Sequence, residues 1–391
     1  MTDTTHPGRR WSLVPLALAA GAAAFAVSLL MLPAQWATWS SGDDFARMSV
    51  APLAGNGPFP HRMLGPLLAH LLGLSGDRYW LFSHGMLVTF LAAVFATAVH
   101  AGCSLLGAFV LTLVVSITGA VEVFKGYVGY AEPTSFVLLL ASAALVRRPG
   151  WFWTLMLLGL LNHENLLFFW PWLLDRKAKS AGLRWGDAVG AAVVLALYWL
   201  ERQWLTTGIL PASLYVSHQK LPFIAGAWIL AVLGIVVWFG VLPVLLAWHA
   251  WFDGWRRAGT SIVLALGAFF GMTFLANDLQ RFVGFLAIPV TFAGIRMLQQ
   301  PRGVLVVTLL GAITVPLIVW QRDVVRLVFD ELMVVAGRQA AAGEALDPIS
   351  AVPTEVVPEL WYVFAGYVAA HAVMLYAGRR WARRWRAAAG S

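Results

Sequence analysis

Residues 151–174 read WFWTLMLLGLLNHENLLFFWPWLL, and this stretch decides how the chain is threaded. It is apolar enough to enter a bilayer, whose core takes ~20 mainly apolar residues of helix. Asn162, His163 and Glu164 interrupt its middle. Basic residues, which favour the cytoplasmic side, flank it at both ends: Arg147, Arg148, Arg176, Lys177, Lys179 and Arg184. The stretch is therefore predicted to form a re-entrant hairpin that starts and ends in the cytoplasm.

The composition indicates a polytopic membrane protein. The 391 residues are 60% hydrophobic and 12% charged, whereas a soluble chain has ~45–50% apolar and ~25% charged residues. A disordered chain and a collagen-like rod are thereby excluded, and a single cysteine excludes a disulfide scaffold. The formal charge of +8 does not indicate a nucleic-acid partner, because the basic residues lie between apolar runs, where they report membrane orientation.

Apolar runs of span length recur along the chain and predict an all-α fold. We expect a transmembrane helical bundle of about ten spans plus the hairpin, with no soluble domain, so that residues 1–391 form a single integral membrane domain. The predicted spans are 12–34, 79–101, 103–121, 133–147, 186–204, 223–250, 258–276, 281–298, 302–320 and 359–378. Both termini are then cytoplasmic, as expected for a protein of the bacterial inner (plasma) membrane, with most Lys and Arg residues on that side.

The segments between the predicted spans limit where any chemistry can occur. Residues 35–78 and 321–358 are the predicted outer loops, and residues 379–391 form a basic cytoplasmic tail that contacts anionic lipid headgroups. Since no soluble domain is expected, a reaction must take place in the membrane or at its outer face.

Two adjacent acids, Asp43 and Asp44, follow directly on the first predicted span. A carboxylate there can act as general base on an incoming hydroxyl, or bind a divalent cation through oxygen. The same sequence also suits a helix cap, with Ser41 or Asp43 capping a helix that starts near Phe45. The sequence alone gives these interpretations equal weight.

His61 and Arg62 stand where a run of turn residues gives way to an apolar helix too short to span the bilayer. We expect this helix to lie in the outer interface. The start of a helix favours an anion, and the arginine fork suits phosphate. The simpler interpretation is an arginine that extends its head to water. The position at a helix start favours the phosphate contact.

The loop 122–133 mixes acids, a base, glycines and tyrosines. Its Lys125, Tyr130 and Glu132 suit a sugar site, through hydrogen bonds and ring stacking. They equally suit an interfacial aromatic belt with a Glu122–Lys125 ion pair.

In the hairpin, Glu164 needs a proton or a partner. His163 is adjacent in sequence, and adjacent helical residues do not face each other. A partner from another helix is therefore expected. A structural polar cluster is at least as good an interpretation as direct catalysis.

The remaining candidates lie in later outer loops. His218 and Lys220 share one loop, where Lys220 is a candidate phosphate contact, and Asp278 and Arg281 lie in another. Asp278 and Arg281 can pair on one helical turn, or Arg281 can reach a phosphate. We see no metal-ligand spacing among the isolated histidines.

Taken together, these landmarks resemble the GT-C glycosyltransferase superfamily, polytopic enzymes that use a polyprenyl-phosphate-linked sugar as donor. The matching features are Asp43-Asp44 after the first span, the run Phe59-Pro60-His61-Arg62-Met63-Leu64-Gly65-Pro66, the acid of a broken helix in His163-Glu164, and Asp278 and Arg281 followed by Pro289. Two features depart from the family: many members carry a soluble C-terminal domain, and His163 stands where a basic residue is common.

The resemblance implies a mechanism. Asp44 or Asp43 would be the catalytic base that deprotonates an acceptor hydroxyl of a glycan, lipid or protein, and Arg62 and Arg281 would hold the donor phosphate. No cofactor is required in such enzymes, although a divalent cation at Asp43 and Asp44 stays open. The other residues that would line the substrate site are His61, Lys125, Tyr130, Glu132, His163, Glu164, His218, Lys220 and Asp278.

Two other classes of protein fit parts of the pattern. A transporter or flippase of a lipid-linked glycan would use the same arginines without a base, although the inverted repeats typical of transporters are not seen. A membrane O-acyltransferase would use His163 as an intramembrane base, and its activity would not depend on Asp44.

Overall fold

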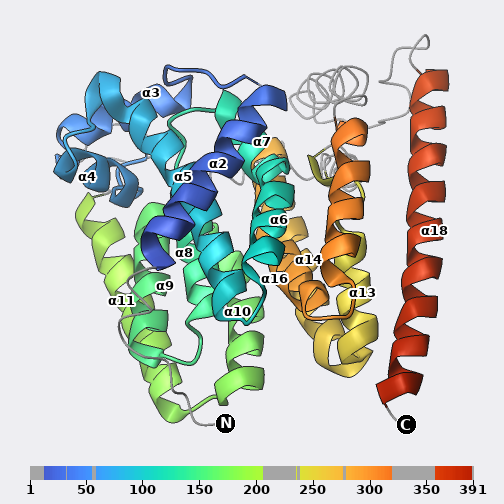
Figure 1. Ribbon diagram of the computed structural model, residues 1–391. Helices are drawn as coiled ribbons and strands as arrows, with labels where there is room; N and C mark the ends of the chain where they lie inside the picture. Colours follow the sequence, from blue (N-terminus) through green and yellow to red (C-terminus); the bar gives the residue numbers. More distant parts are fainter. Residues whose placement is uncertain are drawn as a thin grey trace. The chain divides into compact units, whose positions relative to one another are not determined.

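The computed structural model describes residues 13–31, 33–54, 59–205, 235, 238–275, 279–318 and 357–389. These residues form helices joined by short connections and contain no strand, which confirms the all-α prediction for this part of the chain (Figure 1). The chain divides into two compact units. Unit 1 comprises residues 1–208 and 298–304, and unit 2 comprises residues 209–297 and 305–391.

Three helical segments of the described chain are long and apolar enough to cross a membrane, as expected for a membrane protein. They are α2 (Leu13–Met31), the segment Gly76–His100 that contains α5 (Tyr79–His100), and the segment Arg281–Leu298 that ends in α16 (Ala287–Leu298). A fourth candidate is the pair α6 (Leu105–Ser116) and α7 (Gly119–Gly126), bent by 46°.

Unit 1 is built around α5, which packs against α2, α6 and α8 (Glu132–Ala144). Small residues of α2 let the two backbones approach closely. A Cβ atom at Gly21 would lie 2.7 Å from the carbonyl oxygen of Val88 and from the backbone nitrogen of Ala92. This contact fixes α2 on α5.

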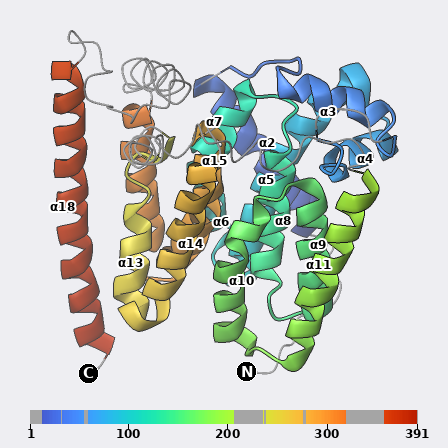
Figure 2. The same ribbon diagram turned by 180° about the vertical axis from the view of Figure 1, so that it is seen from behind.

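Two short helices, α3 (Ser41–Val50) and α4 (Leu64–Leu71), form one end of unit 1 (Figures 1 and 2). The short apolar helix predicted after Arg62 is therefore present as α4, eight residues long. Phe45 and Met48 of α3 pack with Ala69 of α4 on Tyr79 and Phe82 of α5. This apolar contact holds the end layer on the bundle.

The apolar stretch 151–174 is divided between α9 (Pro149–Asn162) and α10 (Leu166–Ala181). His163 has an extended backbone and ends α9. The turn is tight, because a Cβ atom at Gly159 would lie 2.0 Å from the side chain of Leu166. Thus the helix breaks at the polar residues that the sequence singled out, while the re-entrant path through a bilayer stays a prediction.

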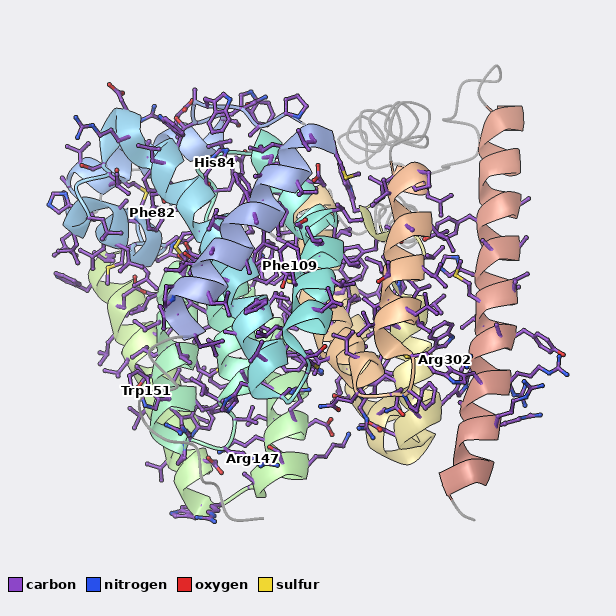
Figure 3. All side chains as sticks on the ribbon, in the orientation of Figure 1. Phe82, His84, Phe109, Arg147, Trp151 and Arg302 are labelled. Atoms are coloured by element: carbon purple, nitrogen blue, oxygen red, sulfur yellow. The ribbon has the colours of Figure 1, made fainter. Side chains whose placement is uncertain are left out.

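A buried ion pair lies at the end of unit 1 opposite α3 and α4. Figure 3 places Trp151 and Arg147 near one end and Phe82 and His84 near the other. At the end near Arg147, Lys177 of α10 lies 3.3 Å from Asp187 and donates to the carbonyl oxygen of Val146. This buried contact ties α10 to the start of α11 (Trp185–Leu205).

Unit 2 contains α13 (Val244–Asp253), α14 (Trp255–Leu275), α15 (Leu279–Val283), α16 and α18 (Val357–Ala389). Arg296 of α16 pairs with Asp253 at 2.5 Å. On the other side of α13, the Trp248 indole donates to the carbonyl oxygen of Met374 at 3.2 Å. These contacts tie α13 to α16 and to α18.

Candidate functional site

The centre of the candidate site is an ion pair between Arg62, just before α4, and Glu164, in the break between α9 and α10. Arg62 Nε lies 3.0 Å from Glu164 Oε2, and Arg62 Nη2 contacts Oε1. The carboxylate thus fills one edge of the guanidinium fork, a strong bidentate arrangement. The Arg62 side chain is 11% exposed and that of Glu164 is 30% exposed, so the pair is sheltered but open to solvent at the carboxylate.

His61 adds a second contact to the same carboxylate. Its Nε2 lies 3.4 Å from Glu164 Oε2, and the ring is buried. Burial lowers the pKa of His61 below its ordinary value, against the opposing effect of the neighbouring Glu164 charge. The imidazole is therefore neutral at pH 7, and the positive charge beside Glu164 comes from Arg62.

A second carboxylate, Glu132, reaches the site through His163. His163 Nε2 lies 3.6 Å from Glu132 Oε1, and Nδ1 lies 3.6 Å from Glu164 Oε2. The backbone N–H of Asn165 also donates to Nδ1 at 3.2 Å. Nδ1 thus accepts the Asn165 N–H, while Nε2 faces Glu132. Both ring nitrogens are thus engaged with protein groups.

Asn162 fixes the break against α8. Its amide donates to the carbonyl oxygen of Ala131 and to Ser135 Oγ, both at 2.8 Å. On the α4 side, a Cβ atom at Gly65 would lie 3.3 Å from Asn162 Oδ1 and 3.2 Å from Tyr79 Oη. The site therefore joins the loop before α4, the start of α8 and the α9–α10 break.

The C-terminal part of α11 contributes residues that sequence reasoning missed, namely Tyr198, Glu201 and Arg202. Arg202 Nη1 donates to Tyr198 Oη at 2.7 Å, and its charge interacts with those of Glu164 and Glu201. Figures 1 and 2 both show this end of α11 beside α4. The available signal was the Glu201-Arg202 pair at the end of a predicted span, where charges are costly.

The two acids of the first outer loop lie in the first turn of α3. Asp44 forms an ion pair with Arg47 one turn later, and Asp43 accepts a hydrogen bond from Thr38 Oγ1. The helix starts at Ser41 rather than near Phe45, and its N-cap residue makes no side-chain capping bond. The predicted cap by Ser41 or Asp43 is therefore wrong. The acidic side chains add favourable charge to the helix start instead.

The loop that carries these acids packs on the connection between α7 and α8. The backbone N–H of Gln35 donates to the carbonyl oxygen of Lys125 at 2.9 Å, and that of Trp39 to Val128 at 3.2 Å. At the crossing point, a Cβ atom at Gly42 would lie 2.1 Å from the Val128 carbonyl oxygen. Glycine is needed at position 42 because the two backbones touch.

Lys125 and Tyr130 of the candidate sugar loop are buried. Lys125 Nζ lies 2.8 Å from Glu122 and donates to the carbonyl oxygen of Ser28 at the end of α2. Tyr130 packs edge-to-face on Tyr127, with ring centroids 5.6 Å apart. The Glu122–Lys125 pair, considered as the structural interpretation of this loop, is present, and it holds α7 on α2.

Of the four remaining candidates, the structure describes one, Arg281. His218, Lys220 and Asp278 lie outside the described residues. Arg281 is a half-buried residue of α15 in unit 2. Among the residues that the structure describes, no group of three or more His, Cys, Asp or Glu side chains could hold a metal ion. The structure thus brings together His61, Arg62, Glu132, His163 and Glu164.

Comparisons with known proteins do not identify the chain. No protein-family model matches it, and searches of curated proteins and of solved structures return no match.

Proposed function

We propose that this protein is an integral membrane glycosyltransferase that moves a sugar from a polyprenyl-phosphate donor to an acceptor hydroxyl at the extracytoplasmic face. The observation that carries the proposal is the clustering of Arg62 with Glu164 at the end of unit 1 that α3 and α4 form. That end also holds Asp43 and Asp44. A candidate phosphate contact and a candidate base therefore belong to one layer of unit 1.

Each group has a role in the proposed reaction. Asp44, or Asp43 beside it, takes the proton of the acceptor hydroxyl while that oxygen attacks the anomeric carbon of the sugar. The bond between the anomeric carbon and the phosphate oxygen breaks, and the polyprenyl phosphate leaves with the electron pair. Arg62 stabilises the charge that develops on the phosphate. A divalent cation at Asp43 and Asp44 is an alternative to acid–base chemistry alone.

The proposed setting is the bacterial inner membrane. About ten spans and the hairpin 151–174 would place both termini in the cytoplasm and α3 and α4 in the outer interface. The described helices support this arrangement, because predicted spans coincide with them, as α5, α11 and α14 illustrate. Lipid-linked donors are expected to reach the site from the bilayer.

One geometric observation weighs against the O-acyltransferase alternative. A histidine base needs a ring nitrogen free to take a proton from the acceptor. His163 accepts the Asn165 N–H at Nδ1 and faces Glu132 through Nε2. These contacts suit a residue that stabilises the break between α9 and α10 rather than one that removes a proton from a substrate.

The proposal is tested with purified protein and a panel of polyprenyl-phosphate sugars, with mass spectrometry to detect transfer or hydrolysis. An enzyme should lose turnover in Asp44→Asn and still bind the lipid phosphate. The matched control is Asp77→Asn, an acid of the same outer loop that lies in the turn before α5. A flippase would instead move the unchanged lipid across liposomes, in wild type and in Asp44→Asn alike. Translocation of the lipid without covalent change of any donor would refute the proposal that this protein is an enzyme.

A further inference from the structure

The Arg62 fork is occupied by a group of the protein itself. The edge of the guanidinium formed by Nε and Nη2 contacts both oxygens of Glu164. Phosphate oxygens use the same planar, two-point geometry on arginine as a carboxylate does. A ligand phosphate therefore cannot take that edge of Arg62 while Glu164 holds it.

The surroundings of Glu164 carry more than one positive group. Arg202, on α11, interacts with the Glu164 charge from a different element than Arg62 does. It is half-buried, and its guanidinium is positioned by the bond to Tyr198 Oη at 2.7 Å. Arg202 thus adds positive charge near Glu164 from the end of α11 that lies beside α4 (Figures 1 and 2).

The other charged and titratable groups around Glu164 come from four elements of unit 1. The loop before α4 supplies His61, and the break supplies His163. Glu132 of α8 lies beside His163, and the Glu201 side chain of α11 lies near Arg202. A second anion beside Glu164 would face repulsion from that carboxylate, whereas an anion that replaces Glu164 on Arg62 would take over its favourable contact.

We propose that Glu164 is an internal carboxylate that occupies a phosphodiester subsite formed by Arg62 and Arg202, and that the donor phosphate binds by displacing it. The inference rests on the proposed function and deepens it by naming Arg202 as a phosphate contact and Glu164 as the group that competes with the substrate. The 30% exposure of the Glu164 side chain gives the ligand a route to the pair.

The test measures binding of farnesyl phosphoryl-mannose, with the uncharged farnesyl mannoside as a ligand that lacks phosphate. Glu164→Gln keeps the shape and hydrogen bonding of the side chain but removes its charge. Binding of the phosphodiester should tighten about tenfold, because a charge-assisted contact on Arg62 becomes a neutral one. Binding of the mannoside should not change. Arg202→Gln should weaken the phosphodiester in both the wild-type and the Glu164→Gln background.

Glu201→Gln is the matched control, since it changes a neighbouring carboxyl group without freeing the Arg62 fork. It should shift the affinity of the phosphodiester by less than about threefold. Equal tightening in Glu201→Gln and Glu164→Gln would overturn the inference, and so would equal or weaker binding in Glu164→Gln than in wild type. If Glu164→Gln does not fold, Glu164→Asp replaces it, because the shorter side chain keeps the charge but reaches Arg62 poorly and should also tighten binding.

Farnesyl phosphate separates this inference from the proposed function. If farnesyl phosphate binds more tightly to Glu164→Gln while no variant transfers or binds a phosphoryl sugar, the displacement of Glu164 is supported and the glycosyltransferase proposal is refuted. If the phosphoryl sugar reacts but its affinity is the same in wild type and Glu164→Gln, the enzyme proposal is supported and the displacement of Glu164 is refuted.

Discussion

Arg62 and Glu164, separated by 102 positions in the sequence, meet through two guanidinium nitrogens and two carboxylate oxygens. The pair joins the loop before α4 to the break between α9 and α10. It is therefore a structural link as well as the centre of the candidate site, and the two roles can be separated by measurement.

Arg62→Met should destabilise the protein, because it leaves the Glu164 carboxylate sheltered without its main cation. We expect a loss of about 2 kcal/mol, below the ~3–5 kcal/mol of a fully buried pair, since Glu164 is partly exposed. Unfolding in a titration with sodium dodecyl sulfate measures the change. The double variant Arg62→Met/Glu164→Met should recover most of the loss. Equal stability of Arg62→Met and wild type would show that the pair contributes nothing.

Lys125→Met should cost more than Arg62→Met, because Lys125 and Glu122 are both fully buried. We expect a loss of about 3–5 kcal/mol, because the buried Glu122 carboxylate loses its contact with the Lys125 ammonium. Lys179→Met, which breaks the more exposed pair with Asp175, should cost no more than about 1 kcal/mol. If Lys125 contacts sugar directly, as the sequence also allowed, Glu122→Gln/Lys125→Met would restore stability but not sugar affinity. Recovery of both would leave Lys125 a purely structural role.

Gly42→Ala should displace the start of α3, because the new methyl group would meet the Val128 carbonyl oxygen. Overpacking of this kind costs about 1–3 kcal/mol, and the shift should lower any activity that depends on Asp43 or Asp44. Gly126→Ala is the control, since a Cβ atom there meets nothing within 4 Å. Unfolding curves and turnover of the two variants are compared, and identical behaviour would contradict the close contact.

His61 should make stability depend on pH. Its pKa is lowered in the folded protein by burial, so the unfolded chain takes up the proton first as the pH falls below the ordinary value of 6.5. Stability therefore decreases on acidification below pH 6.5. The His61→Gln variant should lose less stability than wild type over that range. The measurement is the unfolding midpoint as a function of pH. His100→Gln, at an exposed histidine, serves as control, and a larger acid loss in His61→Gln would reverse the sign and refute the argument.

Part of this architecture could be predicted from the sequence, because it depends on local patterns. Apolar runs fix the helices, and a polar triplet inside one of them fixes the break after Asn162. The need of Glu164 for a partner outside its own helices follows from the cost of an unpaired carboxylate. Its identity as Arg62 does not follow, because no local rule relates residues 102 positions apart. Arg202 was missed for a similar reason, since it closes a run that otherwise resembles a plain membrane span.

The close contact between α2 and α5 at Gly21 has a consequence for Asp43 and Asp44 of α3. The α2 backbone rests on the Val88 carbonyl at Gly21, so sliding α2 along α5 would bring a residue with a Cβ atom into this contact, where it would collide. The depth at which α2 ends is therefore constant, and so is the height from which the following segment carries Asp43 and Asp44. We therefore expect α2 to keep its position along α5 when a ligand binds, so that any adjustment of those carboxylates comes from the residues after α2.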